Sequence, residues 1–106
     1  MDFKFVKIVI FTPVTHAEKV RKALAQAGAG KIGNYDSCSF SSRGIGRFRP
    51  LKGANPFIGK SEKLEEVEED RIEVICSSEQ MKEVLEAAKK AHPYEDPAID
   101  IIPLRN

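Results

Sequence analysis

The 106-residue sequence lacks the features that define several large classes of protein. Its two cysteines, Cys38 and Cys76, form no Cys-x-x-Cys pair, and two are too few for a disulfide framework. We therefore expect two packed thiols in a reducing compartment. No apolar run is long enough to cross a bilayer. Residues 1–11 have no small-residue cleavage site and are typical of a first strand, so the expected location is the cytoplasm.

A charge excess of one sign is also missing. The 17 Lys and Arg against 16 Asp and Glu give a formal net charge of +1, which provides no general field for nucleic acid or an anionic membrane. We expect neither as a partner, and a charged ligand has to use a local patch. The length allows one hydrophobic core but not two, so residues 1–106 are predicted to form a single domain.

The first 30 residues predict a strand followed by a helix. Residues 3–11 are rich in β-branched and aromatic side chains, as strands are. Val20, Leu24 and Ala27 recur at helical spacing within residues 16–27, and a glycine follows as the stop. Thr15 and Glu18 have the spacing of a capping box at the start of this helix.

The remaining residues predict four more strand segments and a second helix. Residues 32–42 and 45–51 are expected to form a hairpin that turns at residues 42–44. Residues 50–64 contain Gly and Asn-Pro without periodicity, which indicates a long loop of the kind that often carries function. A strand over 71–76, a helix ending at His92 and a strand over 98–104 complete the chain. The acidic run 62–70 is interpreted as a solvated loop and strand entry without chemistry.

The order β-α-β-β-α-β predicts an α+β fold, the split β-α-β sandwich of the ferredoxin type. Both helices then cover one face of the sheet. The first and last strands of the sequence carry apolar residues at both parities, so we also expect the helix-free face to be covered. Because the predicted helices cover only one face, self-association is the simplest way to cover the other.

Two glycine-containing motifs are weak indicators of a ligand. Gly28, Gly30 and Gly33 have the G-x-G-x-x-G spacing, but they leave a helix and enter a strand, whereas a dinucleotide site needs the reverse. Residues 43–49 resemble an RNA-recognition segment without its stacking rings. Arg47 and Arg49 share one strand face, which keeps a smaller anion open as a ligand.

A metal site is the alternative. His16 begins the first helix and His92 ends the second, and antiparallel helices bring these ends to one edge of the domain together with Glu95. No short metal-binding spacing such as HExxH supports it, and helix-end histidines without a metal are the simpler interpretation. Neither cysteine has the neighbours of a nucleophile. We therefore expect no cofactor.

Several ordered segments resemble one family. These are residues 28–35 (GAGKIGNY), 44–51 (GIGRFRPL), 53–59 (GANPFIG) and 92–95 (HPYE). Together they are similar to the central insertion domain of the NGG-interacting-factor-three family (Nif-three-like, YqfO-type). That domain is itself similar to the signalling protein PII and the divalent-cation-tolerance protein CutA, so the resemblance implies a PII/CutA-like, ferredoxin-like fold.

The resemblance has further implications for function. The family's dinuclear metal centre is built by two flanking halves that this sequence does not contain, so its suggested hydrolase or cyclohydrolase activities are not carried over. PII-like and CutA-like proteins form trimers with ligands at subunit clefts. The resemblance points to a surface of recurring residues, and with the two arginines these are the expected ligand or partner contacts: Asn34, Tyr35, Arg47, Arg49, Asn55, Phe57, His92 and Glu95.

The leading hypothesis is therefore a non-catalytic, cytoplasmic, homo-oligomeric module, with a trimer favoured, that has a regulatory or binding role. Its expected partner is a small anionic ligand or another protein. The alternative is a metal-binding protein or an accessory domain related to metal-dependent hydrolases, which uses His16, His92 and Glu95. A third reading is a structural partner of a separately encoded flanking domain.

Overall fold

The computed structural model describes residues 3–105, and its elements follow the order β-α-β-β-α-β. The strands are β1 (Phe5–Pro13), β2 (Phe40–Phe48), β3 (Glu65–Ser77) and β4 (Ile99–Leu104). A 3₁₀ turn, η1 (Val14–His16), precedes α1 (Ala17–Gln26), and α2 is Met81–Ala91. Among the described residues no helix is long and apolar enough to span a membrane.

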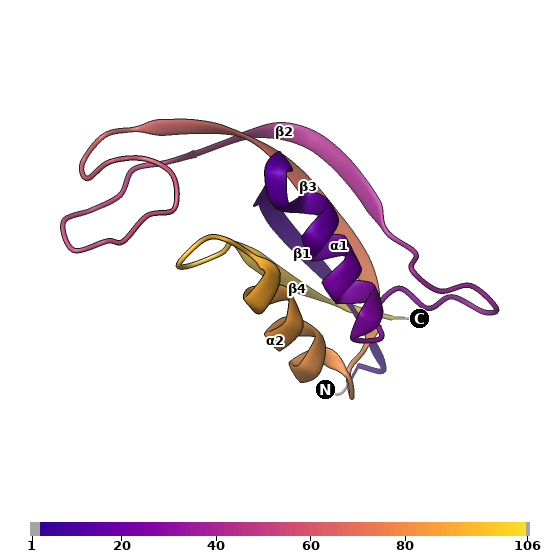
Figure 1. Ribbon diagram of the computed structural model, residues 1–106. Coiled ribbons are helices and arrows are strands. Elements are labelled where there is room, and N and C mark those ends of the chain that lie inside the picture. The colour runs from indigo at the N-terminus through magenta and orange to yellow at the C-terminus, as the bar shows by residue number, and fades with distance from the viewer. Residues whose placement is uncertain (1–2, 106) are drawn as a thin grey trace.

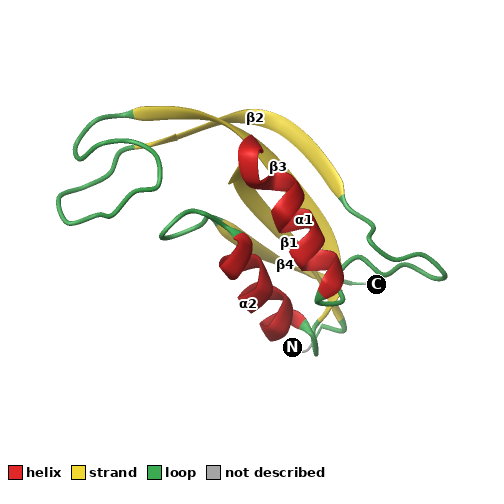
Figure 2. Ribbon diagram, viewed as in Figure 1, coloured by secondary structure: helices red, strands yellow, loops and turns green. Residues whose placement is uncertain are grey.

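The four strands form one antiparallel sheet in the order β2-β3-β1-β4, and both helices lie against the same face of it (Figures 1 and 2). This is the predicted ferredoxin-like arrangement. Strands β2 and β3 continue well past the helices as an arm, which ends in the loop of residues 49–64 (Figure 1). The arm makes the molecule long, with principal extents of 45 × 28 × 21 Å.

The core lies between the helices and the two central strands. Alternate residues of β1 face the helices, since side chains along a strand point to opposite sides of the sheet. Val20, Leu24 and Val84 of the helices pack onto them and are fully or almost fully buried. The strand members of this cluster are Val6, Ile8, Ile10, Ile72, Val74 and Cys76. Gly28, with φ +106°, ends α1 as the sequence predicts.

The helix-free face combines apolar residues with ion pairs. Val9 lies at its centre and is fully buried, opposite Glu73 on β3. The Glu73 carboxylate lies 3.3 Å from Lys7 Nζ and 3.6 Å from Arg71 Nε. Phe40, at the start of β2 and opposite Glu73, is two-thirds exposed. Charged side chains therefore cover part of the helix-free face that was expected to be apolar. At the edge of that face Phe40 stays exposed to solvent.

The predicted turn at residues 42–44 is wrong. Gly44 lies within the continuous strand β2 and pairs with Glu69, and it does not have the positive φ of the turn glycines. Gly53 and Gly59, with φ +96° and +98°, take those positions in the loop between β2 and β3. Serine and glycine favour turns when taken alone, but pairing with the long strand β3 keeps them extended. The predicted strand over 32–42 is likewise mostly loop.

Two local predictions also fail. Thr15 does not cap α1, because its hydroxyl lies 2.9 Å from His16 Nδ1 within the 3₁₀ turn, and Glu18 turns to Arg21 instead. The acidic run, expected to be a solvated loop and strand entry, instead provides the first half of β3 with residues 65–70. Glu69 and Asp70 are buried there, and both have specific partners.

Candidate ligand-binding cleft

A cleft of about 440 Å³ opens where the arm meets the turn between α2 and β4. Strand β1 contributes Phe11 to it, the end of β2 contributes Phe48, and the post-α2 turn contributes Tyr94. The loop of residues 49–64 closes one side. The other lining residues are Gly46, Arg47, Arg49, Pro50, Leu51, Ala54, Pro56, Phe57, Ile58, Glu69, Glu95, Asp96 and Ala98.

A buried carboxylate lies beside the aromatic rings of the cleft. Glu69 is about 91% buried on β3, and the Tyr94 hydroxyl donates a 2.9 Å hydrogen bond to its Oε2. Burial and this bond raise the pKa of Tyr94 far above its ordinary value. A Cβ at Gly46 would collide with the Glu69 carboxylate, so the glycine provides the space in which the carboxylate lies. The rings of Phe48 and Tyr94 meet edge to face at 5.7 Å.

The loop of residues 49–64 is fastened to the body at two points. The backbone N–H of Asn55 donates to Glu95 Oε2 at 3.1 Å. The ring of Phe57 packs edge-on against His16, with ring centroids 5.2 Å apart. Of the residues predicted from the sequence, four therefore line the cleft, namely Arg47, Arg49, Phe57 and Glu95. Asn55 and His16 contact two of these four.

His92 is next to the cleft but is occupied by structural contacts. Its Nε2 lies 2.7 Å from the carbonyl oxygen of Phe11, and its Nδ1 accepts a hydrogen bond from the backbone N–H of Tyr94 at 3.1 Å. This pattern requires a neutral ring protonated at Nε2. Burial lowers the pKa of His92, which favours the same state. Both ring nitrogens are therefore engaged within the protein, and the ring joins the end of β1 to the end of α2.

The cleft has a basic side and an acidic side. Arg47 and Arg49 line it from the arm, and Arg47 Nε is 3.7 Å from Glu66 Oε2. Glu95 and Asp96 line it from the post-α2 turn. The two arginines can hold an anionic group by charge-assisted hydrogen bonds, while the rings offer flat apolar surface.

Asn34 and Tyr35 are not part of this cleft. They lie in the connection between α1 and β2, at the end of the molecule opposite the loop of residues 49–64 (Figure 1). Tyr35 is 75% exposed. Within one chain, the sequence-predicted surface is therefore divided between two ends of the fold.

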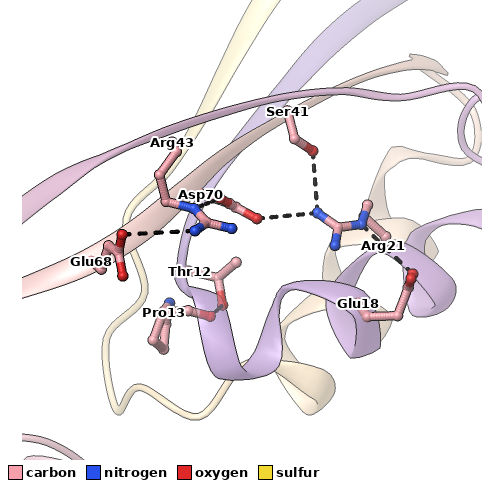
Figure 3. Close-up of polar contacts among 8 residues, drawn as sticks. All are labelled: Thr12, Pro13, Glu18, Arg21, Ser41, Arg43, Glu68 and Asp70. Carbon is pink, nitrogen blue, oxygen red and sulfur yellow. Dashed lines mark hydrogen bonds and ion pairs between the residues drawn. The ribbon is translucent and has the colours of Figure 1, made fainter.

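A second polar cluster was not predicted. Asp70, on the helix side of β3, accepts from Arg43 Nε at 2.6 Å and from Arg21 at 3.4 Å (Figure 3). The hydrogen bond from Arg43 lowers the pKa of Asp70 below its ordinary range. Arg21 also donates to Ser41, so the cluster joins α1 to both strands of the arm. Asp70 is one of several acidic residues in a row, so the sequence gives no sign that it is the one bonded to Arg21 and Arg43.

Glu69 and Gly46 also went unrecognised in the sequence, although one signal was present. An isolated glycine inside a strand often marks a close approach by another group, which is what the Glu69 carboxylate makes at Gly46. Among residues 3–105, no group of three or more His, Cys, Asp or Glu side chains is placed to hold a metal ion.

No family model matches the chain. The chain is 54% identical over 100 residues to the GTP cyclohydrolase 1 type 2 homolog of Halalkalibacterium halodurans, and the match covers 94% of the chain and 27% of that protein. It is 49% identical over 98 residues to the protein of the same name from Bacillus subtilis, with 92% and 26% covered. The chain thus spans about a quarter of the length of these relatives.

Solved structures agree with this relationship. The Bacillus cereus protein related to NIF3 superposes with a TM-score of 0.85 at 50% identity, covering 98% of this chain and 26% of that one. The periplasmic divalent cation tolerance protein CutA from Archaeoglobus fulgidus superposes with a TM-score of 0.69 at 24% identity, covering 96% of this chain and 85% of that one. The second likeness shows a shared fold.

Proposed function

Because the chain belongs to the NIF3-related family through one segment of those proteins, with the fold of CutA, we propose that it is a non-catalytic binding module whose ligand occupies the cleft beside the arm. The ligand is a small molecule that carries an anionic group and a flat apolar part. The single observation that carries this proposal is the combination of aromatic rings with Arg47 and Arg49 around one cavity of about 440 Å³.

The size and lining of the cleft support a small-molecule ligand. Its volume lies within the range of about 300–1,000 Å³ that is usual for ligand pockets. Rings from four separate segments surround it, and the hydrogen bond to Glu69 holds Tyr94 in place in the ligand-free protein. A fixed wall reduces the ordering cost of binding. The arginines are exposed and stand at the mouth, where they can meet an anionic group first.

We propose in addition that the chain forms a homo-oligomer, with a trimer favoured, in the cytoplasm. The radius of gyration is 14.6 Å, whereas a compact chain of this length has about 13 Å. The difference reflects an arm that has little of its own core beneath it. Strands β2 and β4 are the free edges of the sheet, and Phe40 and Ile102 next to those edges are exposed. Such edges and apolar margins are usually covered.

Titration calorimetry with pyrophosphate tests the proposed ligand site. We expect binding by the unaltered chain and at least tenfold weaker binding by Arg49→Gln, since a charge-assisted contact is lost. Arg105→Gln is the matched control, because Arg105 is exposed and does not line the cleft. Equal affinity for both variants, or no heat with the unaltered chain up to millimolar pyrophosphate, would show that the cleft does not take anions.

The metal-binding alternative gains no specific observation from the structure. His92 uses both ring nitrogens for backbone contacts, and Glu95 accepts from Asn55. The ring of His16 packs against Phe57. We therefore base the proposed function on the cleft and not on these three side chains as ligands.

A further inference from the structure

The connection between α1 and β2 ends in a small, well-defined tip, residues 31–36. Ile32 and Tyr35 exchange both backbone hydrogen bonds, each 2.9 Å long, around the two residues between them. Gly33 has φ +56°, and a positive φ at this position is typical of two-residue hairpin turns. The side chains of Ile32 and Tyr35 are 56% and 75% exposed. The tip therefore displays two large apolar side chains on an ordered backbone.

The base of the tip is held to the sheet. Gly30 N–H donates to the carbonyl of Ile75 at 2.7 Å, and Cys38 N–H donates to the carbonyl of Gly30 at 2.9 Å. The backbone of Cys38 leaves no room for a side chain at Gly30. A rigid exposed tyrosine provides contact area at low entropic cost, and tyrosine is enriched at protein interfaces. These anchors indicate a tip built to contact another surface.

The cleft is the surface that this tip fits best. Its lining is mainly aromatic and aliphatic, and Leu51 and Phe57 are 60% and 53% exposed, so apolar surface at the cleft is open to a partner. The tip and the loop of residues 49–64, which lines one side of the cleft, lie at opposite ends of the molecule, whose longest extent is 45 Å (Figure 1). A chain cannot place its own tip in its own cleft, so a tip that enters the cleft belongs to another copy.

The charges of the two surfaces are complementary. Lys31 precedes the turn of the tip and Asp36 follows it, and both are exposed. The cleft presents arginines on its arm side and the carboxylates of Glu95 and Asp96 on the facing turn. Asp36 can therefore meet the arginine side while Lys31 meets the acidic side. Such a pattern fixes the orientation of docking more than it adds affinity.

We infer that the tip of one copy inserts at the mouth of the cleft of the next, so that Tyr35 completes the ligand site with residues from two chains. This inference rests on the proposed function of the cleft. A contact between unlike surfaces repeats around a ring and closes, or it continues as a filament. Ring closure would also reunite Asn34 and Tyr35 with the other residues of the predicted surface, across the boundary between copies.

Sedimentation velocity over a dilution series tests the docking. We expect a closed oligomer for the unaltered chain and more than tenfold weaker association for Tyr35→Ala, because a buried tyrosine at an interface is often a major contributor. Asp36→Arg and Arg49→Glu should each weaken association by about tenfold, and the double variant should recover most of the loss. Glu83→Arg, an exposed change on α2, is the control and should leave association unchanged.

The outcomes separate this inference from the proposed function. If tip variants assemble like the unaltered chain, or if the double variant is as weak as the sum of its single changes, the tip does not dock in the cleft. Pyrophosphate binding that persists in Tyr35→Ala and Asp36→Arg, which both keep Arg47 and Arg49, would leave the ligand site standing. A chain that stays monomeric at every concentration overturns the docking, and the absence of pyrophosphate binding as well overturns both.

Discussion

Gly46→Ala is the change whose consequence follows most directly from the structure. The new methyl group would collide with the Glu69 carboxylate, which therefore has to leave its place against β2. The 2.9 Å hydrogen bond from Tyr94 to Glu69 is then lost. A hydrogen bond to a charged group contributes about 1.5–3 kcal/mol. Replacing a strand glycine by alanine returns about 0.5–1 kcal/mol, so we expect a net destabilisation of about 0.5–2.5 kcal/mol.

Gly44→Ala provides the matched control. Gly44 lies on the same strand, two residues away, and a Cβ there would meet no atom within 4 Å. This variant should be neutral or more stable by up to about 1 kcal/mol. The free energy of unfolding is measured by urea titration followed by circular dichroism, at one fixed protein concentration, because self-association adds to apparent stability.

A double-mutant cycle isolates the cause. In a Tyr94→Phe background the hydrogen bond is already absent, so Gly46→Ala should cost at least 1 kcal/mol less than it does in the unaltered chain. Absorbance titration gives a second readout, since Gly46→Ala should lower the raised pKa of Tyr94 by removing its bond to Glu69. Equal costs for Gly46→Ala in both backgrounds, or equal stabilities of the Gly44 and Gly46 variants, would refute the reasoning.

Two further predictions concern pH. Burial lowers the pKa of His92 below its unfolded value of about 6.5, so the unfolded chain binds more protons in that window, and the free energy of unfolding should fall as the pH drops below about 6.5. Urea midpoints at pH 7.5 and 5.5 check this, and His92→Gln should show a smaller decline. Asp70→Asn should cost about 1–3 kcal/mol at pH 7. Because the pKa of Asp70 is lowered in the folded protein, its contribution to the free energy of unfolding is present above about pH 3.9. That contribution is lost as the pH falls through the pKa of folded Asp70. Urea unfolding at pH 3 and pH 7 should therefore show a smaller loss of stability in acid for Asp70→Asn.

The order and type of the elements could be read from the sequence because local patterns determine them. Val20 and Leu24 repeat at helical spacing and are buried in α1, and Gly28 ends that helix with a positive φ. The ends of β2 could not be found in the same way. Gly44 and the serines before it favour a turn when taken alone, and only pairing with β3 holds them extended.

The candidate site was predictable only where a local sequence motif marks its residues. Asn55, Phe57 and Glu95 stand in loop motifs that attract attention, and the fold brings them to one cleft. Glu69 and Asp70 are consecutive members of an acidic run, and their side chains point to opposite faces of β3. One meets Tyr94 and the other meets Arg43, which are partners distant in sequence. A charged residue is buried only where it has such partners, and the residues next to it in the sequence do not indicate which partners the fold will bring to it.

The two thiols differ in accessibility in a way that has a practical use. Cys38 is partly exposed at the base of the tip, whereas Cys76 is 2% exposed in the core, and burial raises its pKa. A thiol reagent therefore modifies Cys38 in the native protein, while Cys76 reacts only when β3 separates from the helices. Cys38 thus offers a site for attaching a label beside the tip. The rate at which Cys76 is modified reports how often the core opens.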